Sequence, residues 1–399
     1  MLMAGARRTG DYLPSVVRFA VNSSAHSPLA LWALNSTALA RLLPLAAWQH
    51  PAVHRAAAGR VGVGSRPGRT LRILLRSAAV IVILASESAA LAADALPSWN
   101  DVAAKKSIFE FVARATQPAG PDFVPSSERI AAFDNGGTLW CEQPLDFQSL
   151  FIMDRVKRLA PLHPDWKAKR PFAALLSGDF KAALAGGERT ILQAIAATHA
   201  GMTAEEFEKV VKDWLAAARH PKFKRLYVEM VYQPMVELLA YLRANDFKTY
   251  VVSDDEVEFI RPVAEKAYGI PPEQVIGSAG RHKIELRNGE PLLVRLPAVD
   301  FIDGRDSKPL AIYKIIGRRP VAAFGNSDGD LQMLQWTCAG PGARFCVYIR
   351  HDDGAREWAY DRNSPVGRLD KGLDEAKAKG WTVVSMSNDW KRIFTFEMK

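Results

Sequence analysis

Residues 129–140 read RIAAFDNGGTLW and are the most informative segment of the chain for its fold class. An uninterrupted run of small and apolar residues up to Phe133 is typical of a parallel strand that is buried on both faces. The two glycines that follow Asp134 break this run and predict a tight loop. Because ligands of open α/β sheets bind beyond the carboxyl ends of the strands, Asp134 lies where chemistry is expected.

Two other short apolar runs also end in polar residues. The run at 247–252 is followed by Ser253, and the run at 321–324 is followed by GNSDGD at 325–330. Lys308 opens a predicted helix between these two runs. Strands that alternate with helices predict a parallel sheet with helices on both faces. An aspartate, a hydroxyl group, a lysine and an acidic cluster are therefore expected to meet at one edge of that sheet.

The other elements complete an α/β pattern. Helices are predicted at 100–116 with Asn100 as the cap, at 203–218 with a capping box from Thr203, at 235–244, up to Tyr268 with Gly269 beyond its end, at 308–317 and at 369–379. Strands are predicted at 345–349 and 382–386, and a hairpin at 284–296 turns at Asn288-Gly289.

Residues 145–245, between the first two predicted strands, are predicted to be almost entirely helical. Such a block is too long for a simple crossover connection and indicates an inserted domain. We expect a Rossmann-like α/β core at 93–140 and 232–399, with a helical cap at 141–231.

The chain has 399 residues, of which 48% are hydrophobic and 24% charged, and these are values of a globular protein. Its formal net charge of +9 lies almost entirely in the first 92 residues, which hold ten arginines and no lysine. The remaining chain is nearly neutral, so no nucleic-acid partner is expected.

Residues 1–92 are expected to be a non-globular extension that contains a secretory signal at about 66–92. Arginines precede the apolar run SAAVIVILAS at 77–86, and Ala-Leu-Ala at 90–92 resembles a cleavage site. The signal predicts an exported protein, in the periplasm. Because the apolar run is too short to span a bilayer, no stable membrane span is expected in the mature protein. The depth of the signal suggests translation from near Val61 or Val63. An organelle transit peptide and a disordered tail before an ordinary helix are the alternatives.

The three cysteines are too few for a disulfide framework. In an exported protein, Cys338 and Cys346 could pair across a Gly-Pro-Gly turn. The alternative is that all three cysteines, including Cys141, are buried thiols that behave as small hydrophobic side chains.

The ordered set of strand-end motifs resembles the haloacid dehalogenase-like superfamily of phosphohydrolases. Its first motif, D-x-D-G-T-[LV], corresponds to DNGGTL at 134–139, its second to Ser253, its third to Lys308, and its fourth, G-D-x-x-x-D, to 325–330. The resemblance covers roughly residues 100–395. The helical insertion and the hairpin favour the phosphoserine-phosphatase-like branch, whose cap is of the helical C1 type.

This resemblance implies a Mg²⁺-dependent hydrolase of small phosphomonoesters that acts through an aspartyl-phosphate on Asp134. The implied catalytic and phosphate-binding residues are Asp134, Thr138, Ser253, Lys308 and Gly137. The implied metal ligands are Asp134, the carbonyl of Gly136, Asn326 and Asp330. Neither the identity of the substrate nor the oligomeric state follows from the sequence.

Two positions depart from the family pattern. Gly136 stands where the phosphatases carry a second aspartate, the general acid and base, whose loss lowers rates by about 10²–10⁴. Asn326 stands where the first carboxylate of the fourth motif binds the metal, and Asp328 is a candidate to compensate for the missing charge. The candidates for a replacement acid are Glu142, Asp254 and Asp255.

These departures leave other functions open. One alternative is a degenerate family protein that binds a phosphorylated ligand without efficient turnover. Another is the cleavage of C–halogen or C–P bonds on the same scaffold, since such branches also lack the second aspartate. A third is a structural or partner-binding protein that is insensitive to Mg²⁺ and to phosphate analogues.

Overall fold

A computed structural model describes residues 94–179, 182–183 and 188–397, of which residues 188–192 are described by their backbone alone. The expectations for the signal-like segment and the translation start lie outside these residues. Among the helices that are described, none has the length and apolar character that a membrane crossing requires.

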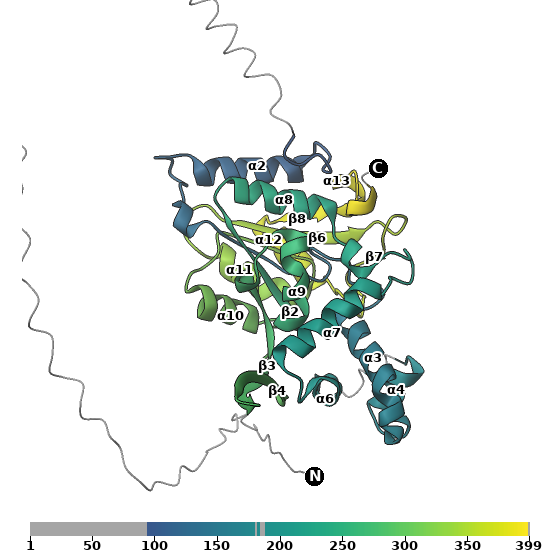
Figure 1. Ribbon diagram of the computed structural model, residues 1–399. Coiled ribbons are helices and arrows are strands. Elements are labelled where there is room, and N and C mark those ends of the chain that lie inside the picture. The colour runs from purple at the N-terminus through teal and green to yellow at the C-terminus, as the bar shows by residue number, and fades with distance from the viewer. Residues whose placement is uncertain (1–93, 180–181, 184–187, 398–399) are drawn as a thin grey trace, which may run out of the picture. The chain divides into compact units, whose positions relative to one another are not determined.

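An eight-stranded, mainly parallel sheet forms the centre of the fold (Figure 1). Strand β1 (Ile130–Phe133) lies between β2 (Lys248–Glu256) and β5 (Ala322–Gly325) and is parallel to both. The other strands are β3 (Val275–Arg287), β4 (Glu290–Phe301), β6 (Phe345–Asp352), β7 (Ala359–Tyr360) and β8 (Thr382–Ser385). The strand order is β4-β3-β2-β1-β5-β6-β7, and β8 pairs with β6. The predicted α/β class is thereby confirmed.

Helices cover both faces of this sheet. They are α2 (Ala103–Thr116), α8 (Gln233–Ala244), α9 (Val257–Tyr268), α10 (Ser307–Ile316), α11 (Leu331–Cys338), α12 (Lys371–Lys379) and α13 (Met386–Asp389). Because side chains alternate along a strand, Ala131 and Phe133 of β1 pack on the face of α2, α8 and α9. Ala132 packs on the face of α10, α11 and α12.

A helical segment joins β1 to β2. It contains α3 (Phe147–Leu159), α4 (Phe172–Ser177), α6 (Glu188–His199) and α7 (Ala204–Ala217). The amide of Cys141 donates to the carbonyl of Met230 over 3.0 Å, so the chain leaves and returns at neighbouring points. The capping box predicted at Thr203 is present at the start of α7. The division into core and cap at 141 and 231 stays a prediction.

Short 3-10 turns connect the larger elements. They are η1 (Ser126–Glu128), η2 (Ala160–Leu162), η3 (Pro164–Lys167), η4 (Tyr227–Glu229), η5 (Pro272–Gln274), η6 (Asp328–Asp330) and η7 (Thr395–Glu397). Cys338, at the end of α11, forms a disulfide with Cys346 of β6, and Cys141 is a buried free thiol.

Three local expectations need correction. Asn100 does not cap the first helix, which begins at Ala103; its side-chain amide instead donates to the carbonyl of Asn388. Strand β2 does not stop at Ser253 but continues, with an irregular register, to Glu256. The hairpin turns at Asn288-Gly289 as predicted, with positive φ at both residues, but its strands extend well beyond 284–296.

The register of the central strands explains why the motifs meet. Phe133 of β1 lies level with Val251 of β2 and with Phe324 of β5. The rings of Phe133 and Phe324 stack with their centroids 4.3 Å apart. The polar residues that follow these strands therefore emerge side by side above a packed aromatic layer.

Candidate active site

Lys308 holds two of the predicted motifs together. Its Nζ donates to Oδ1 of Asp134 and to Oδ1 of Asp330, each over 2.7 Å, and to the carbonyl of Val252 over 3.2 Å. Oδ1 of Asp254 lies 3.3 Å away. The ammonium group is buried at the first turn of α10, with 1% of the Lys308 side chain exposed. One buried cation is thus surrounded by carboxylates from three strand ends.

The electrostatics of this cluster favour added positive charge. Burial and the neighbouring Asp330 carboxylate raise the pKa of Asp134 to about 8, although Lys308 acts in the opposite direction. Burial alone would lower the pKa of Lys308, but Asp134, Asp330 and Asp254 raise it well above its usual value. Burial also raises the pKa of Glu142 well above its usual range. The site therefore holds more carboxyl groups than its cations can neutralise.

Ser253 lines the cavity of the site, whereas Thr138 and Gly137 do not. Ser253 is buried, lines a cavity, and accepts a hydrogen bond at Oγ from the amide of Asp255 over 3.2 Å. The Thr138 hydroxyl lies 3.2 Å from Oδ2 of Asp134, so it orients that carboxylate. Gly137 has a φ of +75°, and a side chain there would overlap Asn326. Neither Thr138 nor Gly137 is among the described residues that line the cavity.

The fourth motif is organised around Asp330. Its Oδ2 accepts hydrogen bonds from the amides of Asn326 and Ser327, each over 3.0 Å, and its Oδ1 faces Lys308. The side chain of Asn326 is engaged at both ends, because Oδ1 accepts from Thr138 over 3.0 Å and Nδ2 donates to Glu142 over 2.7 Å.

Asp328 does not supply the charge that is missing at Asn326. Its Oδ1 accepts from the amides of Asp370 and Gly372, each over 2.9 Å, at the start of α12. The carboxylate thus stabilises that helix terminus, where negative charge is favoured.

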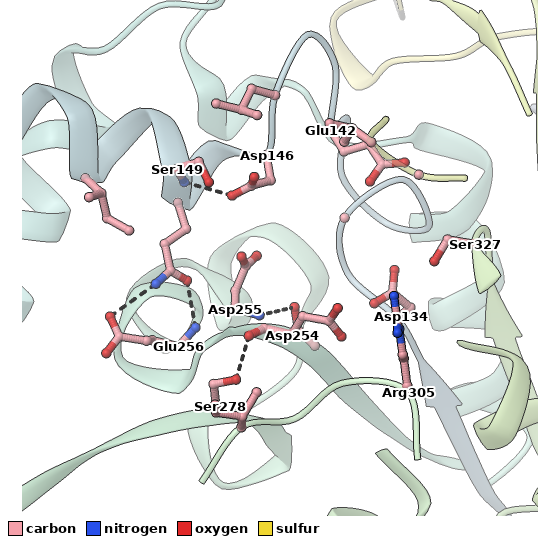
Figure 2. A pocket seen from close by; sticks show the side chains of 18 of the residues that line it. Asp134, Glu142, Asp146, Ser149, Asp254, Asp255, Glu256, Ser278, Arg305 and Ser327 are labelled. Carbon is pink, nitrogen blue, oxygen red and sulfur yellow. Dashed lines mark hydrogen bonds between the residues drawn. The ribbon is translucent and has the colours of Figure 1, made fainter. Parts of the chain in front are cut away.

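A cavity of about 670 Å³ opens beyond the strand ends (Figure 2). Asp134, Gly136, Ser253 and Lys308 line it from the sheet, and Gln148, Ser149 and Ile152 line it from α3. Figure 2 shows Glu142, Asp254, Asp255 and Arg305 around the same space. A cavity of this size accommodates a small ligand, and its lining is rich in carboxyl groups.

Glu256 connects the cavity wall to two other elements. It accepts hydrogen bonds from Gln148 of α3 over 3.1 Å and from Arg295 of β4 over 2.5 Å. Both charged partners are buried, with 3% of the Arg295 side chain and 7% of the Glu256 side chain exposed. The ion pair links β2 to β4, and the hydrogen bond from Gln148 links β2 to α3.

Several residues of the site carry no sequence signal. Arg305 lines the cavity and has a φ of +49°, and only its closeness to Lys308 in the chain could have indicated it. Nε2 of His351, in β6, lies 2.7 Å from the carbonyl oxygen of Gly137, and no motif in the sequence marks this histidine. Tyr360 donates to Glu142 over 2.8 Å from the distant strand β7.

Asp134, Asp330 and the carbonyl of Gly136 fit a Mg²⁺ ion, whereas Asn326, the fourth ligand that the resemblance implies, has its side chain bonded to Thr138 and Glu142. The three that fit are hard oxygen ligands, and the Gly136 carbonyl accepts no hydrogen bond from any residue that the structure describes. Within the described ranges, no three His, Cys, Asp or Glu side chains form a metal site by themselves. Mg²⁺ is commonly held by one or two carboxylates together with waters and substrate phosphate. The raised pKa of Asp134 also fits a nearby divalent cation.

Comparison with known proteins identifies the family. Residues 131–335, more than half of the chain, match the haloacid dehalogenase-like hydrolase family. The chain therefore belongs to the haloacid dehalogenase-like hydrolases, which confirms the resemblance seen in the motifs and makes the protein a hydrolase. No curated protein sequence is significantly similar to it.

Similar solved structures are distant. A protein of unknown function from Bordetella pertussis Tohama I is 18% identical, with 64% of this chain and 98% of that chain covered and a TM-score of 0.40. A phosphoserine phosphohydrolase-like protein from Francisella tularensis subsp. tularensis SCHU S4 is 15% identical (56% and 88% covered, TM-score 0.32). A phospho-aspartyl intermediate analogue of phosphoserine phosphatase is 15% identical (68% and 97% covered, TM-score 0.31).

Proposed function

We propose that this protein hydrolyses small phosphomonoesters through an aspartyl-phosphate on Asp134, with Mg²⁺ as cofactor. The observation that carries this proposal is the buried ammonium of Lys308, which bridges Asp134 and Asp330 beside Ser253 at the wall of a cavity. A nucleophilic carboxylate, a cation for phosphoryl oxygens and a second carboxylate are the groups that phosphoryl transfer to aspartate needs.

Each residue has a distinct role in this mechanism. Thr138 and Lys308 orient the Asp134 carboxylate, whose oxygen attacks phosphorus. The Ser253 hydroxyl and the Lys308 ammonium bind the equatorial phosphoryl oxygens, where the charge of the transition state lies. Asp330, anchored by two main-chain amides, keeps Lys308 in place.

Asp134, Asp330 and the carbonyl of Gly136 would hold the Mg²⁺ ion. A bound Mg²⁺ neutralises the negative charge of the phosphoryl group and of the surrounding carboxylates. Without that charge, a phosphate dianion would be repelled by the acidic lining of the cavity.

The test is a phosphatase assay of the purified protein with a generic aryl phosphate, with Mg²⁺ and with a chelator. We expect phosphate release that depends on Mg²⁺. Release of halide without Mg²⁺ from a haloacid, or cleavage of the C–P bond of a phosphonate, would instead favour the other chemistries of this scaffold.

A second candidate function is binding of a phosphorylated ligand without efficient turnover. Gly136 favours it, because this residue has no side chain to act as the usual acid. The absence of phosphate release, together with a rise in Tm on addition of a phosphate analogue and Mg²⁺, would support this candidate over the hydrolase.

We also propose that the protein acts after export, in the periplasm. The signal-like segment near residues 66–92 and the Cys338–Cys346 disulfide support this location, because disulfides persist in oxidising compartments. N-terminal sequencing of the protein from a periplasmic fraction should give a start near Ala93. Recovery of an intact residue 1 would contradict the proposal.

A further inference from the structure

Glu142 lies beside the position where Gly136 has no side chain. Among the residues that the structure describes, apart from the two chain neighbours, only Glu142 would lie within 4 Å of a Cβ atom at Gly136, with its Oε2 and Cβ each at 3.8 Å. Both residues line the cavity. The carboxyl group of Glu142 is therefore close to the space that an aspartate at position 136 would use.

The surroundings of Glu142 fix which oxygen faces that space. Oε1 accepts hydrogen bonds from Nδ2 of Asn326 over 2.7 Å and from the Tyr360 hydroxyl over 2.8 Å. A side chain at Gly137 or at Gly367 would overlap Oε1, and both glycines have positive φ. Oε1 is thus enclosed, and Oε2 is the oxygen directed toward Gly136.

Asn326 contributes to this arrangement through a property that aspartate lacks. The amide of Asn326 donates a hydrogen bond to Glu142 in either protonation state, whereas a carboxylate at position 326 has no proton to donate and would repel Glu142 whenever Glu142 is ionised. The two departures from the family motifs thus support one structure. Gly136 leaves room for the Glu142 carboxyl group, and Asn326 holds it there.

Asp254 and Asp255, the other two candidates for the replacement acid, lie farther from Gly136 than Glu142 does. Asp254 lies 3.3 Å from Lys308 and has 65% of its side chain exposed. Asp255 is directed toward Asp146 of the segment before α3 (Figure 2). Neither lies within 4 Å of a Cβ at Gly136.

We propose that Glu142 is the general acid and base of this hydrolase, an inference that rests on the proposed phosphatase function. Asp134 attacks phosphorus, the bond from phosphorus to the leaving oxygen breaks, and Oε2 of Glu142 gives its proton to that oxygen. Water then attacks the aspartyl-phosphate and gives a proton to Glu142. The bond from phosphorus to Asp134 breaks, which releases phosphate and restores both side chains.

The first experiment is rapid-mixing kinetics of the Glu142→Gln variant with two substrates. An aryl phosphate with a good leaving group needs no acid in its first step, so the variant should release about one phenolate per site in a burst. Later turnover should then be slowed by about 10²–10⁴, because the aspartyl-phosphate lacks a base for water. An alkyl phosphate should give no burst. A merely structural defect would reduce both substrates alike, and that result would overturn the proposal.

The second experiment restores a carboxyl group at the other position. Gly136→Asp in the Glu142→Gln background should recover alkyl phosphate turnover by at least one order of magnitude. Gly136→Asp alone should give no gain, because two carboxyl groups would compete for one space. A gain from Gly136→Asp alone without recovery in the double variant would contradict the assignment.

The control is Glu110→Gln, the same change on the exposed surface of α2. Far-UV circular dichroism should show that all variants are folded. Full alkyl phosphate turnover by Glu142→Gln would refute the role of Glu142 while leaving the phosphatase function intact. Absence of turnover by the native protein would refute both proposals.

Discussion

At the scale of single residues, Asp134 has to ionise in surroundings that oppose it. Its carboxyl group is buried, and its raised pKa of about 8 reflects burial and the nearby Asp330. Lys308 offsets part of this effect through a hydrogen bond of 2.7 Å. Additional positive charge near Asp134 is therefore needed to keep this carboxyl group ionised, which is the form that can attack phosphorus.

Asp134→Asn should therefore abolish hydrolysis while the protein stays folded. Asparagine keeps the shape of the side chain but cannot form an acyl phosphate, so kcat/KM should fall by on the order of 10⁴ or more. Phosphate release measures the activity, and near-UV circular dichroism measures the packing. Retained activity in this variant would refute the covalent mechanism.

At the scale of elements, the junction between β2 and α9 determines how the cavity is closed. Glu256 at this junction binds Gln148 of α3 and Arg295 of β4. The guanidinium group of Arg295 also lies over the ring of Phe207 in α7, 4.1 Å from its centroid. This buried ion pair joins β2 and β4 of the sheet, and its two side chains also contact α3 and α7.

Arg295→Met should lower the free energy of unfolding by about 3–5 kcal/mol, because it removes the guanidinium partner of the buried Glu256 carboxylate and leaves only His199, 3.6 Å away, whose pKa is lowered by burial. Urea denaturation measures this change. The double variant Glu256→Gln/Arg295→Met should lose less than Arg295→Met alone, since it removes both charges. If the double variant were less stable than Arg295→Met alone, the unpaired charge of Glu256 would not be the cause of the loss in stability.

At the scale of the whole molecule, pH and Mg²⁺ should act on stability together. The folded protein without metal holds the Asp134 proton up to a pKa of about 8, far above the usual value of 3.8. Between these values the folded state binds more protons than the unfolded state, so this contribution to stability is lost as pH rises through 8. A cation that replaces the proton restores the lost stability at high pH.

Added Mg²⁺ should therefore raise Tm more at pH 8.5 than at pH 6. When free Mg²⁺ is 100 times its Kd, the stabilisation is about 2.7 kcal/mol. At pH 6 the ion has to displace a proton from Asp134, so its apparent affinity is weaker. Thermal unfolding with Mg²⁺ and with a chelator at both pH values checks this, with Asp134→Asn as the control. An equal shift at both pH values would indicate that Mg²⁺ binds elsewhere.

Local elements and motif residues could be predicted from the amino-acid sequence alone. The buried strand before Asp134, the capping box at Thr203 and the Asn288-Gly289 turn follow from side-chain pattern and backbone preference, which act over a few residues. The order of the strand-end motifs was enough to indicate the haloacid dehalogenase-like family, which the comparison confirms.

The contacts among those residues follow from the folded chain and could not be predicted from local pattern. In the sequence, Gly136 and Asn326 are departures from the family motifs, and three acidic residues, Glu142, Asp254 and Asp255, remain equal candidates for the missing acid. Folding brings Tyr360 and Asn326 to within hydrogen-bond distance of Glu142, across separations of about 200 residues. Such contacts depend on strand order and register, which pair residues by position in the sheet rather than by distance along the chain.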